Sequence, residues 1–170
     1  MVETKKTDRS ALDRAAYLIA TGAAVGFAPI APGTFGAIEA LAIFIATSAL
    51  MVDNPRAHLY LLVALNLIVF AIGVWSATRA CHICELEDPS QVVIDEVSGQ
   101  LIALTPVAIA PSVLGVIVAF VLFRLFDIFK PYPIRKLERL RAGWGVMSDD
   151  ALAGIYAAAL VALGLWLRLI

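Results

Sequence analysis

Acidic side chains that could bind a metal lie at the borders of the apolar runs of this sequence or among cations. Five carboxylates have this setting, and they are Asp95, Glu96, Asp127, Asp149 and Asp150. Carboxylates that converge in a fold repel one another unless a cation or protons join them. Oxygen ligands without a histidine partner favour Mg²⁺, whose coordination is often completed by a substrate phosphate. The five acids therefore predict a magnesium site, if the fold brings them together.

Cations close to Asp127 supply the second half of this chemistry. They are Arg124, Lys130, Arg135 and Lys136. Arginine and lysine are the usual phosphate binders of proteins. Cations at a membrane surface also attract anionic lipid, with about 1 kcal/mol for each residue. Both interpretations can hold together, but only a metal–phosphate site needs acids placed among the cations.

A segment rich in proline and glycine, residues 29–36, precedes the first long apolar run. We expect it to be irregular rather than helical, because two prolines and two glycines interrupt it. A simple re-entry turn and a backbone loop that presents N–H groups to an anion both fit this composition. Thr34 could cap the following helix or contact the phosphate of a substrate.

The composition is that of an integral membrane protein. Hydrophobic residues make up 61% of the 170 residues and charged residues 16%, against roughly 25% charged in a soluble domain. Residues 35–52 and 59–78 form apolar runs long enough to be the first two transmembrane helices. The first run contains one charge, Glu39, which we interpret as an extra acid facing the site or as a group that reaches the membrane surface.

Residues 97–123 carry no charge but contain two prolines, Pro106 and Pro111. One straight helix would separate Asp95 from Asp127 by about 48 Å and place them on opposite membrane faces. A break near residues 108–111 would instead make a hairpin that returns both acids to one face. With the hairpin, eleven Lys and Arg residues lie on the N-terminal side and two on the other, as the positive-inside rule requires. We therefore predict a re-entrant or proline-broken helical hairpin.

The last apolar run, residues 151–170, is long enough to be the third full span. Ser148 is its predicted N-cap, with Asp149 and Asp150 in the first helical turn, where the helix dipole favours acids. The predicted fold is all-α: an integral membrane bundle of about three full spans, the hairpin and an interfacial N-terminal helix.

The N-terminal region divides into two parts. Residues 1–14 are polar and are predicted to form a cytosolic tail, whereas residues 15–170 form a single membrane-embedded domain. Residues 15–28 are uncharged but too short to span a bilayer, so we expect an interfacial or re-entrant segment there. Cys81 and Cys84 lack a second cysteine pair, and we interpret them as reduced thiols near a helix end.

Four motifs together resemble the phosphatidylglycerophosphatase A family. They are APGTFG at 31–36, VVIDEVSGQLIAL at 92–104, FRLFDIFKPYPIR at 123–135 and GWGVMSDDALAGIYAA at 143–158. The resemblance implies a Mg²⁺-dependent membrane enzyme that hydrolyses phosphatidylglycerophosphate to phosphatidylglycerol and inorganic phosphate. It also implies that the five acids and Lys130 are the functional positions. Two residues depart from the family pattern: Ala142, where a second glycine is common, and Glu39, where a small or apolar residue is usual.

These residues suggest a mechanism in which a metal-activated water attacks phosphorus in line. We expect Asp127 and one of Asp149 and Asp150 to hold Mg²⁺, with Asp95 or Glu96 as ligand or general base. Lys130 and Arg124 would neutralise charge on the phosphoryl oxygens, with Arg135 as a further substrate contact. The resemblance implies a bacterial inner-membrane protein with its site facing the cytosol.

The expected partners are the phospholipid substrate and membrane lipids, with no nucleic acid, and the oligomeric state is not predicted. The main alternative function is a small non-enzymatic membrane scaffold or a cation transporter with an acidic metal site. A transporter predicts ionisable residues deep in its spans, but residues 59–78 and 97–123 contain none. A CDP-alcohol phosphotransferase is disfavoured because its D-G-x2-A-R motif is missing.

Overall fold

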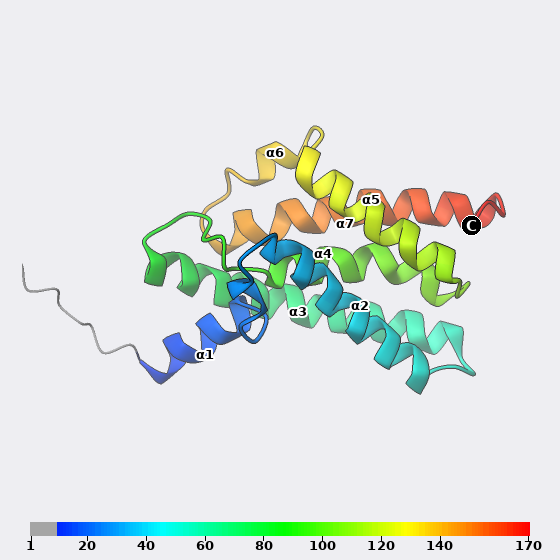
Figure 1. The fold of residues 1–170 in the computed structure, drawn as a ribbon, viewed down its shortest axis with the longest axis horizontal. Coiled ribbons are helices and arrows are strands. Elements are labelled where there is room, and N and C mark those ends of the chain that lie inside the picture. Colours follow the sequence, from blue (N-terminus) through cyan, green and yellow to red (C-terminus); the bar gives the residue numbers. More distant parts are fainter. Residues whose placement is uncertain (1–9) are drawn as a thin grey trace, which may run out of the picture.

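A computed structural model describes residues 10–170, and secondary structure in this range is entirely helical (Figure 1). The α-helices are α1 Ala11–Ala20, α2 Pro32–Leu50, α3 Pro55–Cys84, α4 Ile94–Leu104, α5 Val113–Phe129, α6 Ile134–Leu137 and α7 Gly143–Trp166. Two short 3₁₀ helices, Val25–Phe27 and Thr105–Ala108, complete the described fold. Most of the predicted tail, residues 1–14, lies outside the described residues.

Three helices, α2, α3 and α7, are long and apolar enough to cross a membrane. They confirm the three predicted spans, although each helix begins earlier than predicted. The expectation that residues 29–36 are irregular was wrong in its second half, because α2 begins at Pro32. Proline suits the first position of a helix, where its missing N–H needs no partner. Ala31 is therefore the N-cap, and Thr34 lies inside the first turn.

The last helix, α7, begins at Gly143 rather than near residue 151, so Ser148 is not its N-cap. Glycine is required here by packing, because a Cβ on Gly143 would collide with the carbonyl oxygen of Val74 in α3. The Gly143 N–H also donates to the Thr78 hydroxyl at 3.2 Å. As a consequence, Asp149 and Asp150 lie in the second turn of the helix, buried inside the bundle.

The proline-broken hairpin is confirmed. Helix α4 continues into the 3₁₀ helix Thr105–Ala108, the chain turns at residues 109–112, and α5 returns antiparallel to α4 (Figure 1). The Ser112 hydroxyl accepts the Gly115 N–H at 2.8 Å and caps the start of α5. The hairpin therefore brings the beginning of α4 and the end of α5 to the same end of the molecule.

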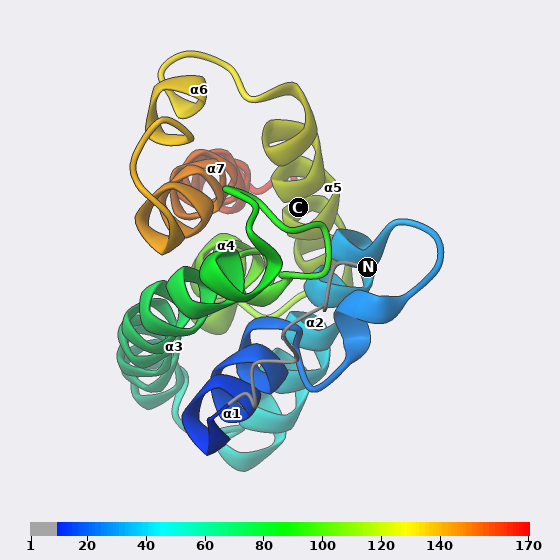
Figure 2. The same ribbon diagram turned by 90° about the vertical axis from the view of Figure 1, so that its left-hand side faces the viewer.

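Helix α4 lies at the centre of the bundle, surrounded by α2, α3, α5 and α7 (Figure 2). Its fully buried Leu101 and Leu104 belong to the main apolar core. On the side of α3, the Asn66 amide donates to the Ser98 carbonyl at 3.0 Å, and the Ser98 hydroxyl donates back to Asn66 at 2.9 Å. Helix α3 thus satisfies the hydroxyl of Ser98 inside the bundle.

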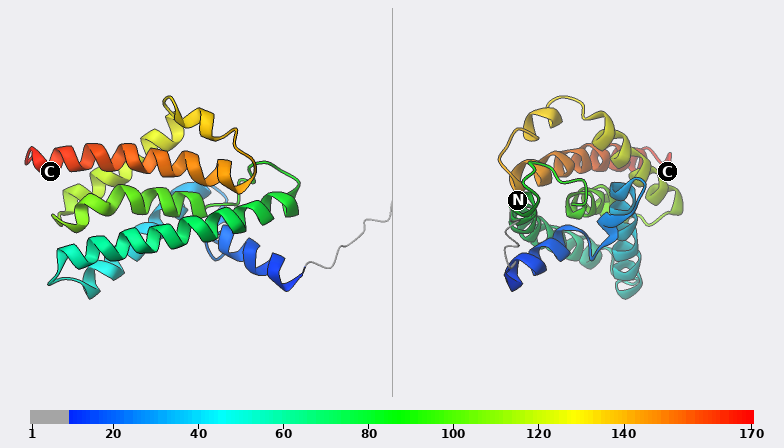
Figure 3. Two further views of the ribbon diagram at one scale, coloured as in Figure 1. Left: turned by 180° about the vertical axis from the view of Figure 1, so that it is seen from behind. Right: turned by 60° about the vertical axis from the view of Figure 1, so that its left-hand side comes forward.

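The two ends of the bundle differ (Figure 3). One end carries α1, α6 and the loop at residues 85–93, and the other carries the α2–α3 turn, the hairpin turn and the C-terminus. An N-terminal helix was predicted at residues 15–28, but α1 spans Ala11–Ala20, because Ser10 and Asp13 form a capping box. Asp13 also pairs with Arg79 of α3 at 2.5 Å. The position of α1 at the membrane interface stays a prediction.

Candidate active site

Three of the five predicted acids meet between α4 and α7, toward the end of the bundle where these two helices begin. Asp95 and Glu96, in the first turn of α4, and Asp150 of α7 each offer an oxygen, and these oxygens lie within 4.8 Å of one another. Each residue also has a buried oxygen without a hydrogen-bond partner in residues 10–170: Asp95 Oδ1, Glu96 Oε2 and Asp150 Oδ2. We call these three residues the carboxylate trio.

Close packing of α4 against α7 brings the trio together. A Cβ on Gly99 of α4 would collide with the Asp150 carbonyl oxygen. A Cβ on Gly154 of α7 would collide with the Gly99 carbonyl oxygen. The two glycines therefore let the helix backbones touch, as small residues do between membrane helices. This contact lies directly beside the acids that face one another.

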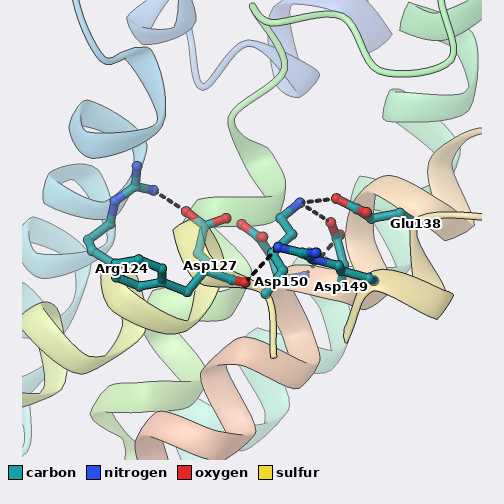
Figure 4. Close-up of polar contacts among 8 residues, drawn as sticks. Arg124, Asp127, Glu138, Asp149 and Asp150 are labelled. Atoms are coloured by element: carbon teal, nitrogen blue, oxygen red, sulfur yellow. Dashed lines mark hydrogen bonds and ion pairs between the residues drawn. The ribbon is translucent and has the colours of Figure 1, made fainter. Parts of the chain in front are cut away.

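Lys130 connects the end of α5 to a fourth acid, Asp149. Its Nζ lies 2.6 Å from Asp149 Oδ2 and 2.7 Å from Glu138 Oε1 (Figure 4). Burial disfavours the lysine charge, but the hydrogen bonds to Asp149 and Glu138 outweigh it and raise the pKa of Lys130 above its ordinary value. Lys130 caps α5 in the left-handed conformation, with φ 43°. Because a lysine rarely adopts this conformation, its place is set by the surrounding contacts.

The fifth acid, Asp127, pairs with Arg124 one turn earlier on α5. Arg124 Nη1 lies 2.6 Å from Asp127 Oδ2 (Figure 4). The carboxylate of Asp127 lies beside that of Asp150 of the trio (Figure 4). All five predicted acids thus belong to one cluster, in which three carboxylates face one another and two are neutralised by cations.

The N-terminus of α2 closes one side of the cluster. A Cβ on Gly33 would collide with Glu96 Oε1 and approach the Arg124 guanidinium. A Cβ on Gly36, one turn further, would contact the Glu96 Cβ and the Val93 backbone. Thr34 lies in this same first turn and is half-buried. The glycines of the APGTFG motif therefore allow the backbone of α2 to approach Glu96.

Arg135 and Lys136, the two other predicted cations near Asp127, both lie in α6. Arg135 donates to the Phe129 carbonyl at 3.4 Å, and Lys136 donates to the Tyr132 hydroxyl at 3.2 Å. Contact of either cation with a substrate stays a prediction. Glu39 lies outside the trio, with Oε2 buried against Gly22 in the turn after α1.

Sequence reasoning missed two acids near Lys130. Glu138 pairs with Lys130 directly, as described above. Desolvation raises the pKa of Asp88, Lys130 opposes this shift, and the charges of Glu138 and Asp127 reinforce it. The signal for Glu138 was present, because it is the single acid within the cation-rich segment 130–141. Asp88 has no such signal, since it is one of three acids in a polar loop.

The carboxylate trio fits a hard divalent cation. Three carboxylates whose buried oxygens lack hydrogen-bond partners form a costly arrangement unless a cation or protons neutralise them. Carboxylate oxygens are the ligands that Mg²⁺ prefers, and Mg²⁺ usually keeps several waters and takes only a few protein ligands. The residues present therefore suit Mg²⁺, with room for ligands from a substrate.

The fold and the site together define a helical membrane protein with a cluster of acids and cations at one end of its bundle. The chain belongs to the phosphatidylglycerophosphatase A family, whose sequence model matches residues 18–165. It is therefore a phosphatase. No solved structure matches the chain at a significant level.

Named relatives cover nearly the whole chain. A Bacteroides thetaiotaomicron protein named putative phosphatidylinositol-3-phosphatase is 44% identical over 88% of this chain and 92% of its own. A phosphatidylglycerophosphatase A of Haemophilus influenzae is 30% identical over 95% of each chain. The phosphatidylglycerophosphatase A of Escherichia coli is 32% identical over 85% of this chain and 80% of its own.

Proposed function

We propose that this protein hydrolyses the terminal phosphate of phosphatidylglycerophosphate, with Mg²⁺ as its cofactor, to give phosphatidylglycerol and inorganic phosphate. One observation carries the proposal in a chain of this family: the unpartnered buried oxygens of the carboxylate trio lie beside Lys130 and Arg124. Acids that accept a metal and cations that accept a phosphate are the two parts that metal-assisted phosphate hydrolysis needs.

Asp95, Glu96 and Asp150 are the residues that would hold Mg²⁺. When bound, the ion would supply Lewis-acid stabilisation of charge on the phosphoryl oxygens and lower the pKa of a bound water. This assignment changes one expectation from the sequence, because Asp127 and Asp149 are paired with Arg124 and Lys130 in the structure. We propose that these two acids orient the cations toward the substrate.

The residues of the chain then have distinct tasks. Lys130 and Arg124 neutralise the phosphoryl oxygens as negative charge develops on them. A water oxygen bonds to phosphorus while the bond from phosphorus to the glycerol oxygen breaks. A carboxylate of the cluster takes one proton from the water, and the glycerol oxygen receives a proton from that carboxyl group or from solvent and leaves as a hydroxyl group. Lys130 must share its hydrogen bonds between Asp149, Glu138 and the phosphate.

The cluster can be reached from the end of the bundle. A cavity of about 230 Å³ extends to Asp149, and its lining residues are Glu87, Asp88, Glu138, Leu140, Ala142, Gly145, Val146 and Asp149. The nearby apolar side chains of Ile128, Phe129 and Tyr132 are exposed. We propose that the lipid keeps its acyl chains beside these apolar residues while its head group enters the acidic cavity.

A second substrate is favoured by one comparison. The relative that is 44% identical is named for phosphatidylinositol 3-phosphate, which also carries a phosphate monoester on a lipid head group. The same trio and cations could act on this bond, because the reaction centre is identical and only the alcohol differs. Both lipids therefore belong in any test of specificity.

The charge distribution supports a site on the cytosolic face of a bacterial inner membrane. Arg79 lies near the end of α3, and six further cations lie in residues 124–141, around the end of α5 and α6 on the side with the site; Arg56 lies at the start of α3 and Arg168 follows the end of α7, toward the other end (Figure 1). Cytosolic loops carry the excess of Lys and Arg in membrane proteins. We propose that the substrate is therefore met at the cytosolic leaflet.

The decisive experiment measures phosphate release by the purified protein in detergent, with phosphatidylglycerophosphate or phosphatidylinositol 3-phosphate and increasing Mg²⁺. Asp95→Asn and Asp150→Asn should reduce turnover at least about 100-fold, because each removes one carboxylate of the trio. Asp53→Asn, in the turn at the opposite end, is the matched control and should retain wild-type turnover. Absence of phosphate release from both lipids would refute both proposed substrates.

A further inference from the structure

Gln100 of α4 is a fully buried polar residue with no role in the site described so far. Its relative exposure is 0%, and neither its amide nitrogen nor its amide oxygen has a hydrogen-bond partner in the part of the chain that the structure describes. A buried amide without partners is costly, since it loses its hydrogen bonds to water and gains none. The Gln100 amide therefore needs a hydrogen-bond partner, which apolar side chains cannot supply.

The other buried amide of the membrane helices shows the contrast. Asn66 of α3 both donates to the backbone of Ser98 and accepts from its hydroxyl. That pair holds α3 against α4 and is complete within the protein. Gln100 lies two residues after Ser98 on another side of the same helix and has no such pair. The two amides therefore differ in function and not only in position.

Helical geometry places Gln100 next to the carboxylate trio. It follows Glu96 by four residues, so the two side chains lie on one side of α4, about one turn apart. The Glu96 side of α4 faces α2, where Gly33 and Gly36 approach the Glu96 side chain. The buried residues of α2 offer no polar side chain to an amide, and they are Gly33, Gly36, Ala37, Ala40 and Phe44. Within one turn, Glu96 Oε2 is a buried acceptor that also lacks a hydrogen bond.

We propose that Gln100 is a positioning residue of the cation site. Its Nε2–H group donates to a bridging water molecule that in turn donates to Glu96 Oε2, and so orients the other Glu96 oxygen toward Asp95 and Asp150. Groups that hold metal ligands in this way typically change metal affinity by about 10–100-fold when they are removed. The inference rests on the proposed function in one respect, namely that a divalent cation occupies the trio.

The test compares Gln100→Met with the wild type in the purified full-length protein without substrate. Methionine keeps an unbranched side chain of similar length but removes both amide atoms. Melting temperature is measured as Mg²⁺ is increased, because a ligand that binds only the folded state stabilises it by RT ln(1 + [Mg²⁺]/Kd), and the fitted Kd is the half-saturating concentration. We expect an unchanged or higher melting temperature without Mg²⁺, and a half-saturating Mg²⁺ concentration raised by about 10–100-fold. Turnover at low Mg²⁺ should fall in parallel and recover at high Mg²⁺.

The matched control is Asn66→Leu, which removes the buried amide that already has its partners. This variant should have a lower melting temperature without Mg²⁺ and a wild-type half-saturating concentration. An unchanged Mg²⁺ response in Gln100→Met would overturn the inference. So would loss of folding in both Gln100→Met and Gln100→Leu, since the amide would then be structural. A wild-type protein that shows no Mg²⁺ response would instead refute the magnesium site of the proposed function, and the inference with it.

Discussion

The Nζ atom of Lys130 lies 2.6 Å from Oδ2 of Asp149, which joins the end of α5 to the second turn of α7. Asp149 is 5% exposed, so the lysine is the cation that neutralises a buried acid. The second partner of Lys130, Glu138, is largely exposed on the segment after α6. Lys130 therefore stands between the buried cluster and the surface, where a phosphate would arrive.

Replacing Lys130 should show whether this lysine acts on the phosphate or only adds positive charge to the surface. We expect Lys130→Met to reduce turnover at least about 100-fold, because it removes a cation that stabilises charge in the transition state. The control is Lys136→Met, whose ammonium group contacts Tyr132 at the surface and should change turnover by less than about twofold. Equal loss of phosphate release in the two variants would contradict a specific role of Lys130.

The raised pKa of Lys130 predicts how its contribution to stability depends on pH. A group whose folded pKa exceeds its unfolded value of about 10.5 stabilises the protein fully below that value, and the effect is lost as pH rises through the folded pKa. The difference in melting temperature between wild type and Lys130→Met should therefore stay constant from about pH 7.5 to 9.5. A difference that disappears within this range would mean that Lys130 has already lost its proton.

Adding one methyl group at Gly33 should displace Glu96. A Cβ there would collide with Glu96 Oε1. Gly33 is the second residue of α2. We expect Gly33→Ala to reduce turnover about 100-fold, because small misplacements of catalytic groups have effects of this size. Gly164→Ala at the opposite end of the bundle meets only the flexible Ile170 side chain and should be close to wild type. The measurement is phosphate release at saturating Mg²⁺.

Ala142 is expected to destabilise the protein through backbone strain, and glycine at this position should remove that strain. As the N-cap of α7 it has φ 49° and ψ −134°, a conformation that L-residues rarely adopt. Ala142→Gly should raise the unfolding free energy by about 0.5–2 kcal/mol, because the relieved strain exceeds the entropy that glycine adds to the unfolded chain. Melting temperatures in detergent test this expectation, and a lower value for the glycine variant would refute it.

The orientation in the membrane can be measured by labelling single cysteines in a Cys81→Ser, Cys84→Ser background. Arg139→Cys reports on the end with the site, and Asp53→Cys reports on the opposite end. A membrane-impermeant maleimide should label the cysteine at position 139 only in inside-out vesicles and that at position 53 only in intact spheroplasts. The reverse pattern would place the site outside the cytosol.

The hairpin was predictable because one straight helix conflicts with membrane thickness. Pro106 and Pro111 offered a break, and the charge distribution required one. The start of α2 was missed because residues 29–36 were interpreted by their proline and glycine content as a loop, although proline suits the first position of a helix. The start of α7 was not predictable, because glycine normally indicates a loop. At Gly143 the backbone of α3 leaves no room for a side chain, so tertiary packing requires glycine within a helix.

The acids of the site were predictable as residue types but not in their pairing. Five carboxylates near cations indicated a metal–phosphate site, and the structure gathers all five into one cluster. The division into a trio and two ion pairs depends on how closely α4 approaches α7, which the sequence does not reveal. Gln100 was missed for the same reason, since the lack of a hydrogen-bond partner can be seen only from the atoms around it.

Because α4 lies at the centre of the bundle, it can carry polar side chains while the outer helices remain apolar toward the lipid. Lipid tails contact the outer helices and require apolar side chains there, but they do not reach a short helix enclosed on four sides. Acids and amides on this inner helix are therefore hidden from the hydrocarbon, and changes among them need not impair insertion. Head-group preference could diverge among relatives through the outlying α6 and the 85–93 loop, while the inner helix keeps the same reaction.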